Sequence, residues 1–327
     1  MTPAIEKWAA QIRAGDVRAL SRAVSSIENR SPEAEDLLKQ LFPHTGRAYR
    51  IGITGAPGTG KSTLVDRLAS HYRAEKKTVG IIAVDPSSPF TGGAILGDRI
   101  RMQSHAGDAG IFIRSMATRG YLGGLAQSTG DASLLLDAAG KEIILLETVG
   151  VGQGEIEIVR FADCTVVVLT PGMGDDIQNL KAGLMEIADI FVLNKYDREG
   201  AQRFEQQLTA MLELVPERDD WKPPIVRTVA TEGKGVDDFA QQIARFREHF
   251  DKPGRRRARE LSYWKEWLLR LLQSSLLERV SHHLTEAQLE ALAAQVSARK
   301  KDPYMAVREI LAESGFAAAE SQTGVKS

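Results

Sequence analysis

The sequence predicts an α/β fold: a doubly wound, mostly parallel sheet with helical extensions at both ends of the chain. Between residues 48 and 250, apolar strand-like runs alternate with amphipathic helical stretches. Two of these runs, residues 79–84 and 143–146, are apolar on both faces, which is typical of parallel strands covered by helices on both sides. A glycine-rich loop at residues 55–62 joins the first run to the first helix of this region.

Residues 1–47 are predicted to form a helical segment ahead of the sheet. Apolar residues recur there at helical spacing, and Gly15–Asp16 separates a first helix from a second. A third helix begins at Ser31–Pro32, because proline is favoured in the first turn of a helix. Pro43 ends it.

The predicted strands of the central domain, residues 48–250, are short, and polar or glycine-rich segments follow them. Ligands of this fold bind at the carboxyl ends of the strands, so these segments should converge. We predict strands at residues 49–54, 78–84, 110–114, 142–148, 164–170, 190–193 and 225–230.

Residues 251–327 are predicted to form a helical arm. After Pro253–Gly254, a long apolar stripe runs from Leu261 to Val280, and two shorter helices follow. The arginine-rich run at residues 255–259 favours a solvated helix start over a nucleic-acid patch, because the chain carries no net excess of basic charge.

Composition is that of an ordinary globular chain and excludes several classes. The 327 residues are 43% hydrophobic and 26% charged, with 42 basic and 43 acidic side chains, so no overall charge would recruit nucleic acid or a membrane. The single cysteine, Cys164, excludes an intramolecular disulfide and is expected to be buried. No run approaches the roughly 18 apolar residues of a membrane span, and residues 1–30 mix charges throughout without the apolar stretch of a signal peptide. We therefore expect a cytoplasmic protein.

The loop at residues 55–62 matches the pattern G-x-x-x-x-G-K-[ST] between a strand and a helix, the setting that this motif requires. Its backbone N–H groups and the helix N-terminus would hold phosphates, Lys61 would reach the β- and γ-phosphates, and Ser62 would bind Mg²⁺. The predicted phosphate-binding residues are Gly55, Ala56, Pro57, Gly58, Thr59, Gly60, Lys61, Ser62 and Thr63.

Residues 194–197 fit the pattern N-K-x-D at the end of a predicted strand. The Asp197 carboxylate can accept two hydrogen bonds from guanine, whereas adenine presents no matching pair of donors. Lys195 would lie along the base, and Asn194 would tie this segment to the phosphate loop. The backbone of Ala230, Thr231 and Glu232, at the end of the last strand, is placed for contacts to guanine O6. The sequence thus predicts GTP rather than ATP.

Three carboxylates follow strands near the phosphate loop and are candidates for the Mg²⁺ side of the site. Glu147 ends a buried strand where an aspartate is usual in phosphate-loop proteins, and Asp85 and Asp98 flank a small, glycine-rich segment. A turn or helix-cap role for the two aspartates stays open. Asp175, Gln178 and Lys181 belong to a loop beside the nucleotide and would contact nucleotide, partner or solvent.

These motifs together resemble the MeaB/ArgK family of GTPases, which includes the human methylmalonic aciduria type A protein. The resemblance covers roughly residues 44–250. The matching stretches are residues 52–63, 83–88, 91–98, 119–124, 147–153, 171–175 and 194–197.

The resemblance implies a slow, partner-stimulated GTPase that binds GTP/GDP and chaperones an adenosylcobalamin-dependent acyl-CoA mutase of the methylmalonyl-CoA mutase type. It implies Mg²⁺ held by Ser62, Asp98 and Glu147, with Asp85 close by. It places Gln153 in a hydrolysis-sensing switch, and Asp175, Gln178 and Lys181 in a further switch, where Lys181 would add positive charge at the γ-phosphate. It also implies a homodimer joined through the C-terminal helices.

Other readings stay open. A nickel-insertion GTPase would need His or Cys ligands, and the chain has only Cys164 and the adjacent pair His282–His283. A signal-recognition-type GTPase would need a Met-rich domain, whereas the chain has seven scattered methionines. An amino-acid-transport ATPase or kinase would need a second substrate pocket, which the sequence does not indicate.

Overall fold

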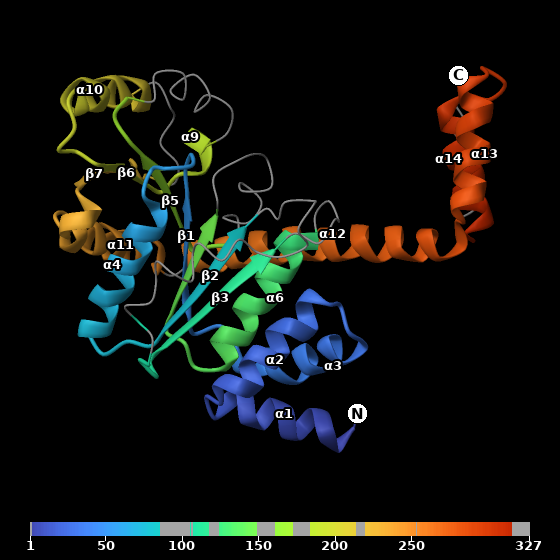
Figure 1. Ribbon diagram of the computed structural model, residues 1–327, viewed down its shortest axis with the longest axis horizontal. Helices are drawn as coiled ribbons and strands as arrows, with labels where there is room; N and C mark the ends of the chain where they lie inside the picture. The colour runs from blue at the N-terminus through green and yellow to red at the C-terminus, as the bar shows by residue number, and fades with distance from the viewer. Residues whose placement is uncertain are drawn as a thin grey trace. The chain divides into compact units, whose positions relative to one another are not determined.

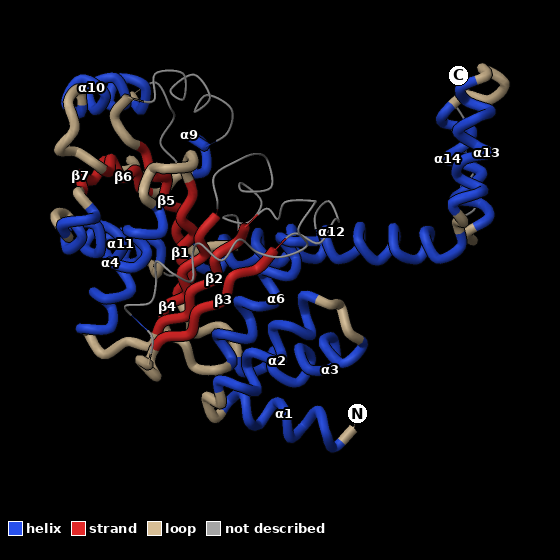
Figure 2. Tube along the Cα trace, in the orientation of Figure 1, coloured by secondary structure: helices blue, strands red, loops and turns tan. Residues whose placement is uncertain are grey.

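The computed structural model describes residues 2–85, 105, 107–117, 124–148, 161–172, 184–213, 220–252 and 254–315. Two compact units contain these residues, Met1–Glu260 and Leu261–Ser327. The first unit contains a seven-stranded parallel sheet in the order β3-β2-β4-β1-β5-β6-β7 (Figures 1 and 2). The predicted fold class is therefore confirmed.

All seven predicted strands are present, with small differences at their ends. Their bounds are β1 Tyr49–Thr54, β2 Val79–Asp85, β3 Ile111–Ala117, β4 Ile143–Thr148, β5 Cys164–Leu169, β6 Ile190–Asn194 and β7 Ile225–Thr228. Strands β1, β4 and β5 are the centre of the sheet, and β4 and β5 are buried along their whole length.

Helices cover both faces of the sheet (Figure 1). On one face, α4 (Lys61–Ala74) and α11 (Val236–Phe250) pack over apolar residues such as Ile51 and Val166. On the other face, α9 (Leu184–Ile187) and α10 (Ala201–Leu212) pack over Val167 and Phe191. Helix α6 (Gly124–Ala138) lies on this second face, because Leu136 packs against Gly80, which alternates with the first-face residues of β2.

The N-terminal segment forms the three predicted helices, α1 (Pro3–Arg13), α2 (Val17–Glu28) and α3 (Pro32–Leu41), followed by a short 3₁₀ turn at Phe42–His44. All three pack against α6. Asp137 on α6 accepts hydrogen bonds from the backbone N–H groups of Gly46, Arg47 and Ala48, at 2.6, 3.2 and 3.1 Å. This carboxylate fixes the connection that leads into β1.

Helix α12 (Arg255–His283) begins in the first unit, where the arginine-rich run differs in part from its predicted solvated role. Arg259 Nη2 lies 3.1 Å from Oδ2 of Asp189, whose side chain is fully buried, and its guanidinium stacks over Phe250. Arg255 pairs with Asp220 at 2.8 Å. Because these two cations already hold acidic partners, the run anchors the start of α12 to the first unit.

The second unit contains the rest of α12, then α13 (Glu286–Ser297) and α14 (Pro303–Glu313). Thr285 caps α13 in a reciprocal capping box with Gln288, and the Asp302 side chain caps α14. Leucines on α12 leave a stripe of apolar surface exposed, formed by Leu261, Leu268, Leu272 and Leu276. No helix among the described residues is both long enough and apolar enough to span a bilayer.

Asp131 on α6 gives a pH-dependent prediction, since burial raises the pKa of its carboxyl to about 7 while Arg30 acts in the opposite direction. The folded pKa lies above the ordinary value, so the contribution of Asp131 to folding stability is fully present below the unfolded pKa and is lost as the pH rises towards about 7. Asp131→Asn should therefore raise the free energy of unfolding by up to about 4 kcal/mol near pH 8 and have little effect near pH 4. Urea unfolding at both pH values measures this. A variant that is no more stable than the parent near pH 8 would contradict it.

Candidate nucleotide-binding site

The phosphate loop joins β1 to α4, and three of its glycines have positive φ angles. Gly55, Gly58 and Gly60 have φ angles of +144°, +77° and +92°, which side-chain-bearing residues rarely adopt. A Cβ at Gly55 would lie 2.2 Å from the carbonyl oxygen of Val168 on β5. The loop therefore fits against the neighbouring strand only with glycine at this position, and it leads directly into the N-terminus of α4.

Lys61, the first residue of α4, is buried and turns its ammonium back over the loop. Nζ donates to the carbonyl oxygens of Gly55 at 2.6 Å and Ala56 at 3.0 Å. The ammonium therefore lies against the backbone of the loop that is predicted to bind phosphates.

Ser62 meets Glu147 at the end of β4, next to β1. Ser62 Oγ donates to Oε1 of Glu147 at 2.6 Å, and the glutamate is only 4% exposed. Among the predicted residues, these two bring a hydroxyl and a carboxylate together beside the loop. Hard oxygen donors of this kind are the ligands that Mg²⁺ prefers, so the pair fits this cation.

Asn194, at the end of β6, connects three segments of the site. Its Nδ2 donates to the carbonyl of Thr59 at 2.8 Å, which is the tie to the phosphate loop that the sequence predicts. Its Oδ1 accepts from Thr228 Oγ1 at 3.0 Å and from the backbone N–H of Ala230 at 3.1 Å. One side chain thus holds the phosphate loop and the segment after β7 in register.

The two other motif residues of the N-K-x-D segment, Lys195 and Asp197, are less buried than Asn194. Lys195 has a left-handed backbone, with φ of +55°, and its Nζ donates to the Gly58 carbonyl at 2.6 Å. Asp197 is exposed two residues further on. Its carboxylate is therefore accessible to a ligand.

The segment after β7 is a 3₁₀ turn, Ala230–Glu232, so Ala230 belongs to this turn and not to the strand predicted at residues 225–230. Sequence reasoning missed one residue that binds this turn, Arg67 on α4, which donates to the carbonyls of Ala230 and Thr231. No local signal links Arg67 to a turn that lies more than 160 residues later. Sequence reasoning also missed Thr148, whose hydroxyl donates to Thr54 at 3.0 Å and joins the ends of β4 and β1.

Several predicted site residues cannot be placed in this geometry. Asp85 ends β2, and the preceding residue, Val84, pairs with Thr148 of β4, so its backbone lies beside the strand that carries Glu147. The residues that lie outside the described part of the chain are Asp98, Gln153, Asp175, Gln178 and Lys181.

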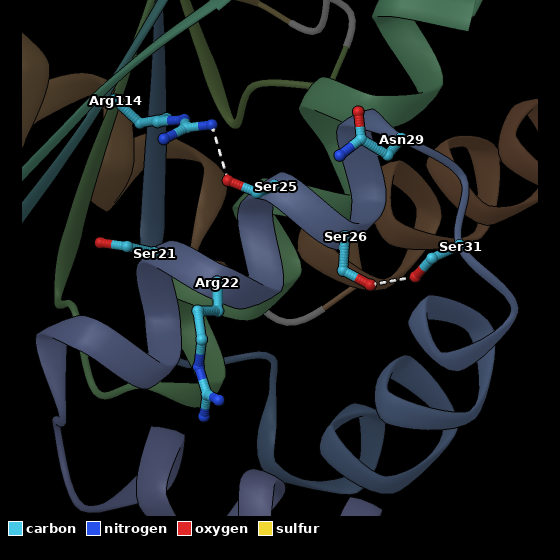
Figure 3. Close-up of a pocket in the computed structure, with 7 residues that line it drawn as sticks. All are labelled: Ser21, Arg22, Ser25, Ser26, Asn29, Ser31 and Arg114. Carbon is cyan, nitrogen blue, oxygen red and sulfur yellow. Dashed lines mark hydrogen bonds between the residues drawn. The ribbon is translucent and has the colours of Figure 1, made fainter.

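A separate hollow of about 420 Å³ lies between α2, the start of α3 and β3, and none of its lining residues belongs to the phosphate loop, the N-K-x-D segment or the Ala230–Glu232 turn. Figure 3 shows Arg114 turned towards Ser25, with Nη2 to Oγ at 3.0 Å, and Ser26 turned towards Ser31. Arg114 also pairs with Glu28. The lining residues are Ser21, Arg22, Ser25, Ser26, Asn29, Ser31 and Arg114.

Residues 20–285 match the family described as Methylmalonyl Co-A mutase-associated GTPase MeaB. This chain belongs to the MeaB family. The match includes the phosphate loop, Glu147 and the N-K-x-D segment, so the resemblance predicted from the motifs is confirmed. The chain is accordingly a P-loop GTPase.

Relatives in three organisms agree with this assignment to the MeaB family. A Pyrococcus abyssi protein whose name includes the word GTPase is 47% identical over 312 residues, covering 94% of this chain and 96% of that one. GTPase ArgK of Escherichia coli is 36% identical, covering 83% and 84% of the two chains. The mouse protein named methylmalonic aciduria type A homolog, mitochondrial, is 34% identical, covering 76% of this chain and 60% of that one.

A solved structure of a protein called LAO/AO transport system kinase has the same fold as this MeaB-family chain. The two align with a TM-score of 0.73 and 26% sequence identity, over 95% of this chain and 97% of that one.

Proposed function

We propose that this MeaB-family GTPase is a chaperone of an adenosylcobalamin-dependent acyl-CoA mutase of the methylmalonyl-CoA mutase type. It would gate cofactor loading and protect or reactivate the mutase according to its nucleotide state. The observation that carries the proposal is the match of residues 20–285 to a family described as mutase-associated. The cytoplasm is the compartment in which we expect it to act.

In this proposal the described residues divide the work of holding GTP. The amides of residues 55–62 and the N-terminus of α4 bind the phosphates, and Lys61 exchanges its two carbonyl partners for phosphate oxygens. Asp197 accepts hydrogen bonds from guanine. Asn194 sets the distance between base and phosphates, because it is hydrogen-bonded to the phosphate loop and to the turn after β7. Thr63 is the third residue of α4 and belongs to the first helical turn after the loop.

Magnesium would be held by Ser62, Asp98 and Glu147, with Asp85 close by. The close contact between Ser62 and Glu147 supports this, because both oxygens already face one another at the loop. When bound, Mg²⁺ would neutralise charge on the β- and γ-phosphates. Gln153 would belong to the segment that senses hydrolysis.

The C-terminal residues 251–327 would form a dimerisation arm that follows, along the chain, a GTPase domain at residues 48–250. The exposed leucine stripe on α12 supports a homodimer, because its members recur on one helical face and are apolar. Light scattering would measure the mass in solution, and a monomer at micromolar concentration would contradict the dimer.

The mutase proposal predicts that Lys181→Ala abolishes partner-stimulated hydrolysis while GTP affinity is retained. By family position, Lys181 adds positive charge at the γ-phosphate only once the partner is bound. The measurement is GTP turnover with and without a purified adenosylcobalamin-dependent acyl-CoA mutase, for the parent chain and the variant. Lys222→Ala, a change outside the predicted switch, is the control. If the parent is not stimulated, the mutase proposal fails; if the variant is still stimulated, only the role of Lys181 fails.

The nickel-insertion alternative gains no support, because the described residues contain no group of three or more His, Cys, Asp or Glu side chains that could hold a metal. Cys164 is buried at the start of β5, as predicted, and burial raises the pKa of its thiol. The kinase alternative is tested in the same turnover assay, since labelled γ-phosphate would appear on an acceptor rather than as free phosphate.

A further inference from the structure

Arg67 connects α4 to the turn after β7. Its Nε donates to the Ala230 carbonyl at 3.1 Å, and its Nη2 donates to the Thr231 carbonyl at 2.8 Å. Two donors of one planar guanidinium therefore bind two successive carbonyls. A guanidinium is well suited to this task, because its donors form a rigid fork, whereas a lysine ammonium is a single point charge.

The same turn is held from its other side by Asn194. The Ala230 N–H donates to Asn194 Oδ1 at 3.1 Å, so Asn194 binds the N–H of Ala230 and Arg67 binds its carbonyl. The turn closes on itself through a hydrogen bond from Val229 N–H to the Lys234 carbonyl at 3.0 Å. Asn194 and Arg67 tie it to β6 and to α4, the helix that begins at the phosphate loop.

Arg67 is not used in the ion pairs of the described residues. Arg73, two turns further along α4, instead places Nε and Nη2 on the carboxylate of Asp108, at 2.8 and 2.9 Å. The two arginines thus differ in their partners: Arg73 binds a carboxylate near the C-terminal end of α4, and Arg67 binds the backbone of the Ala230–Glu232 turn.

We propose that Arg67 is a positioning residue for guanine recognition. It fixes the position of the Ala230–Glu232 turn relative to α4. The turn then borders the base while the phosphate loop holds the phosphates. Without it, the turn would lose its two hydrogen bonds to α4 while keeping the bond from Ala230 N–H to Asn194, and it would let nucleotide leave faster. The inference rests on the proposal that Ala230, Thr231 and Glu232 border guanine.

The test compares Arg67→Ala and Arg67→Lys with Arg73→Ala as the matched control. In Arg67→Ala, GDP labelled with a fluorescent ribose group should dissociate about five- to tenfold faster, because the two lost hydrogen bonds are partly exposed. The KM for GTP should rise by a similar factor with kcat unchanged at saturating GTP. Arg67→Lys should lie between Arg67→Ala and the parent. Arg73→Ala should lower the melting temperature without changing the dissociation rate.

Amide hydrogen exchange separates positioning from a general loss of stability. Exchange at residues 229–233 should accelerate in Arg67→Ala and stay unchanged in Arg73→Ala. If Arg67→Ala lowers the melting temperature but leaves dissociation and exchange as in the control, the inference is overturned. Base selectivity of Asp197→Asn is measured beside it: a variant that switches base while Arg67→Ala has no effect overturns only the role of Arg67, and failure to switch overturns the proposed guanine site itself.

Discussion

Asp197→Asn should transfer the preference of this GTPase from GTP to xanthosine triphosphate. A carboxylate at this position accepts hydrogen bonds from the guanine N1–H and the exocyclic amine. The asparagine carboxamide instead presents a donor, which opposes the guanine amine and matches the xanthine oxygen. Sites built on such pairs reject the wrong base strongly, so GTP affinity should fall by about two orders of magnitude.

The structure supports the position of Asp197 through its neighbours rather than through a bound base. Asn194 and Lys195 are both hydrogen-bonded to the phosphate loop, to Thr59 and Gly58, so the exposed Asp197 is held at a set distance from the phosphate site. Competition of GTP, xanthosine triphosphate and ATP for labelled GDP measures the preference. Asp238→Asn, which changes an exposed aspartate on α11, is the control. Unchanged selectivity in Asp197→Asn would refute the guanine assignment.

The strands were predictable because burial on both faces leaves a local pattern in the sequence, but their ends depended on partners elsewhere. The prediction ended β3 at Arg114, yet the strand continues to Ala117 because residues 115–117 pair in register with residues 83–85 of β2. The prediction extended β7 to Ala230, yet the chain leaves the strand after Thr228 and enters a turn held by Asn194.

The order of the strands and the packing of the N-terminal helices were not predictable from local pattern. Neighbours such as β1 and β4 are separated by two intervening strands in the chain, and periodicity gives no information on which strands pair. The bonds of Asp137 to residues 46–48 join segments about 90 residues apart, and an aspartate on a helix gives no sign of such a partner.

The site was predictable where a motif encodes its own geometry. The glycines of the phosphate loop and the tie from Asn194 to that loop follow from the motif, because phosphate and base must be held at a fixed separation. The contribution of Arg67 could not be predicted, because an arginine on a helix after a phosphate loop has many possible partners. The specific residues of a motif are thus easier to infer than the side chains that hold them in place.

Gly60→Ala should weaken guanine nucleotide binding by about two orders of magnitude. Gly60 has φ of +92°, and a Cβ there would lie 2.4 Å from Nδ2 of Asn194. The Asn194 carboxamide would have to move, and it would lose its bonds to Thr59 and Ala230. A single added methyl group would therefore disturb the phosphate loop and the Ala230–Glu232 turn together.

Gly58→Ala is the matched control in the same loop. Gly58 also has a positive φ, +77°, but a Cβ there meets nothing within 4 Å, so this variant carries the backbone strain without the clash. Titration with labelled GDP should show a much smaller loss for Gly58→Ala than for Gly60→Ala. Equal losses would mean that strain alone, and not Asn194, accounts for the effect.

Asn194→Ala completes the argument as a double-mutant cycle with Gly60→Ala. If the methyl group acts by displacing Asn194, then Gly60→Ala should cost little further affinity once Asn194 is already alanine, and the two changes should be strongly non-additive. If the two losses simply add, the methyl group acts on the phosphate loop alone. In that case the coupling between phosphate and base recognition does not pass through the contact between Gly60 and Asn194.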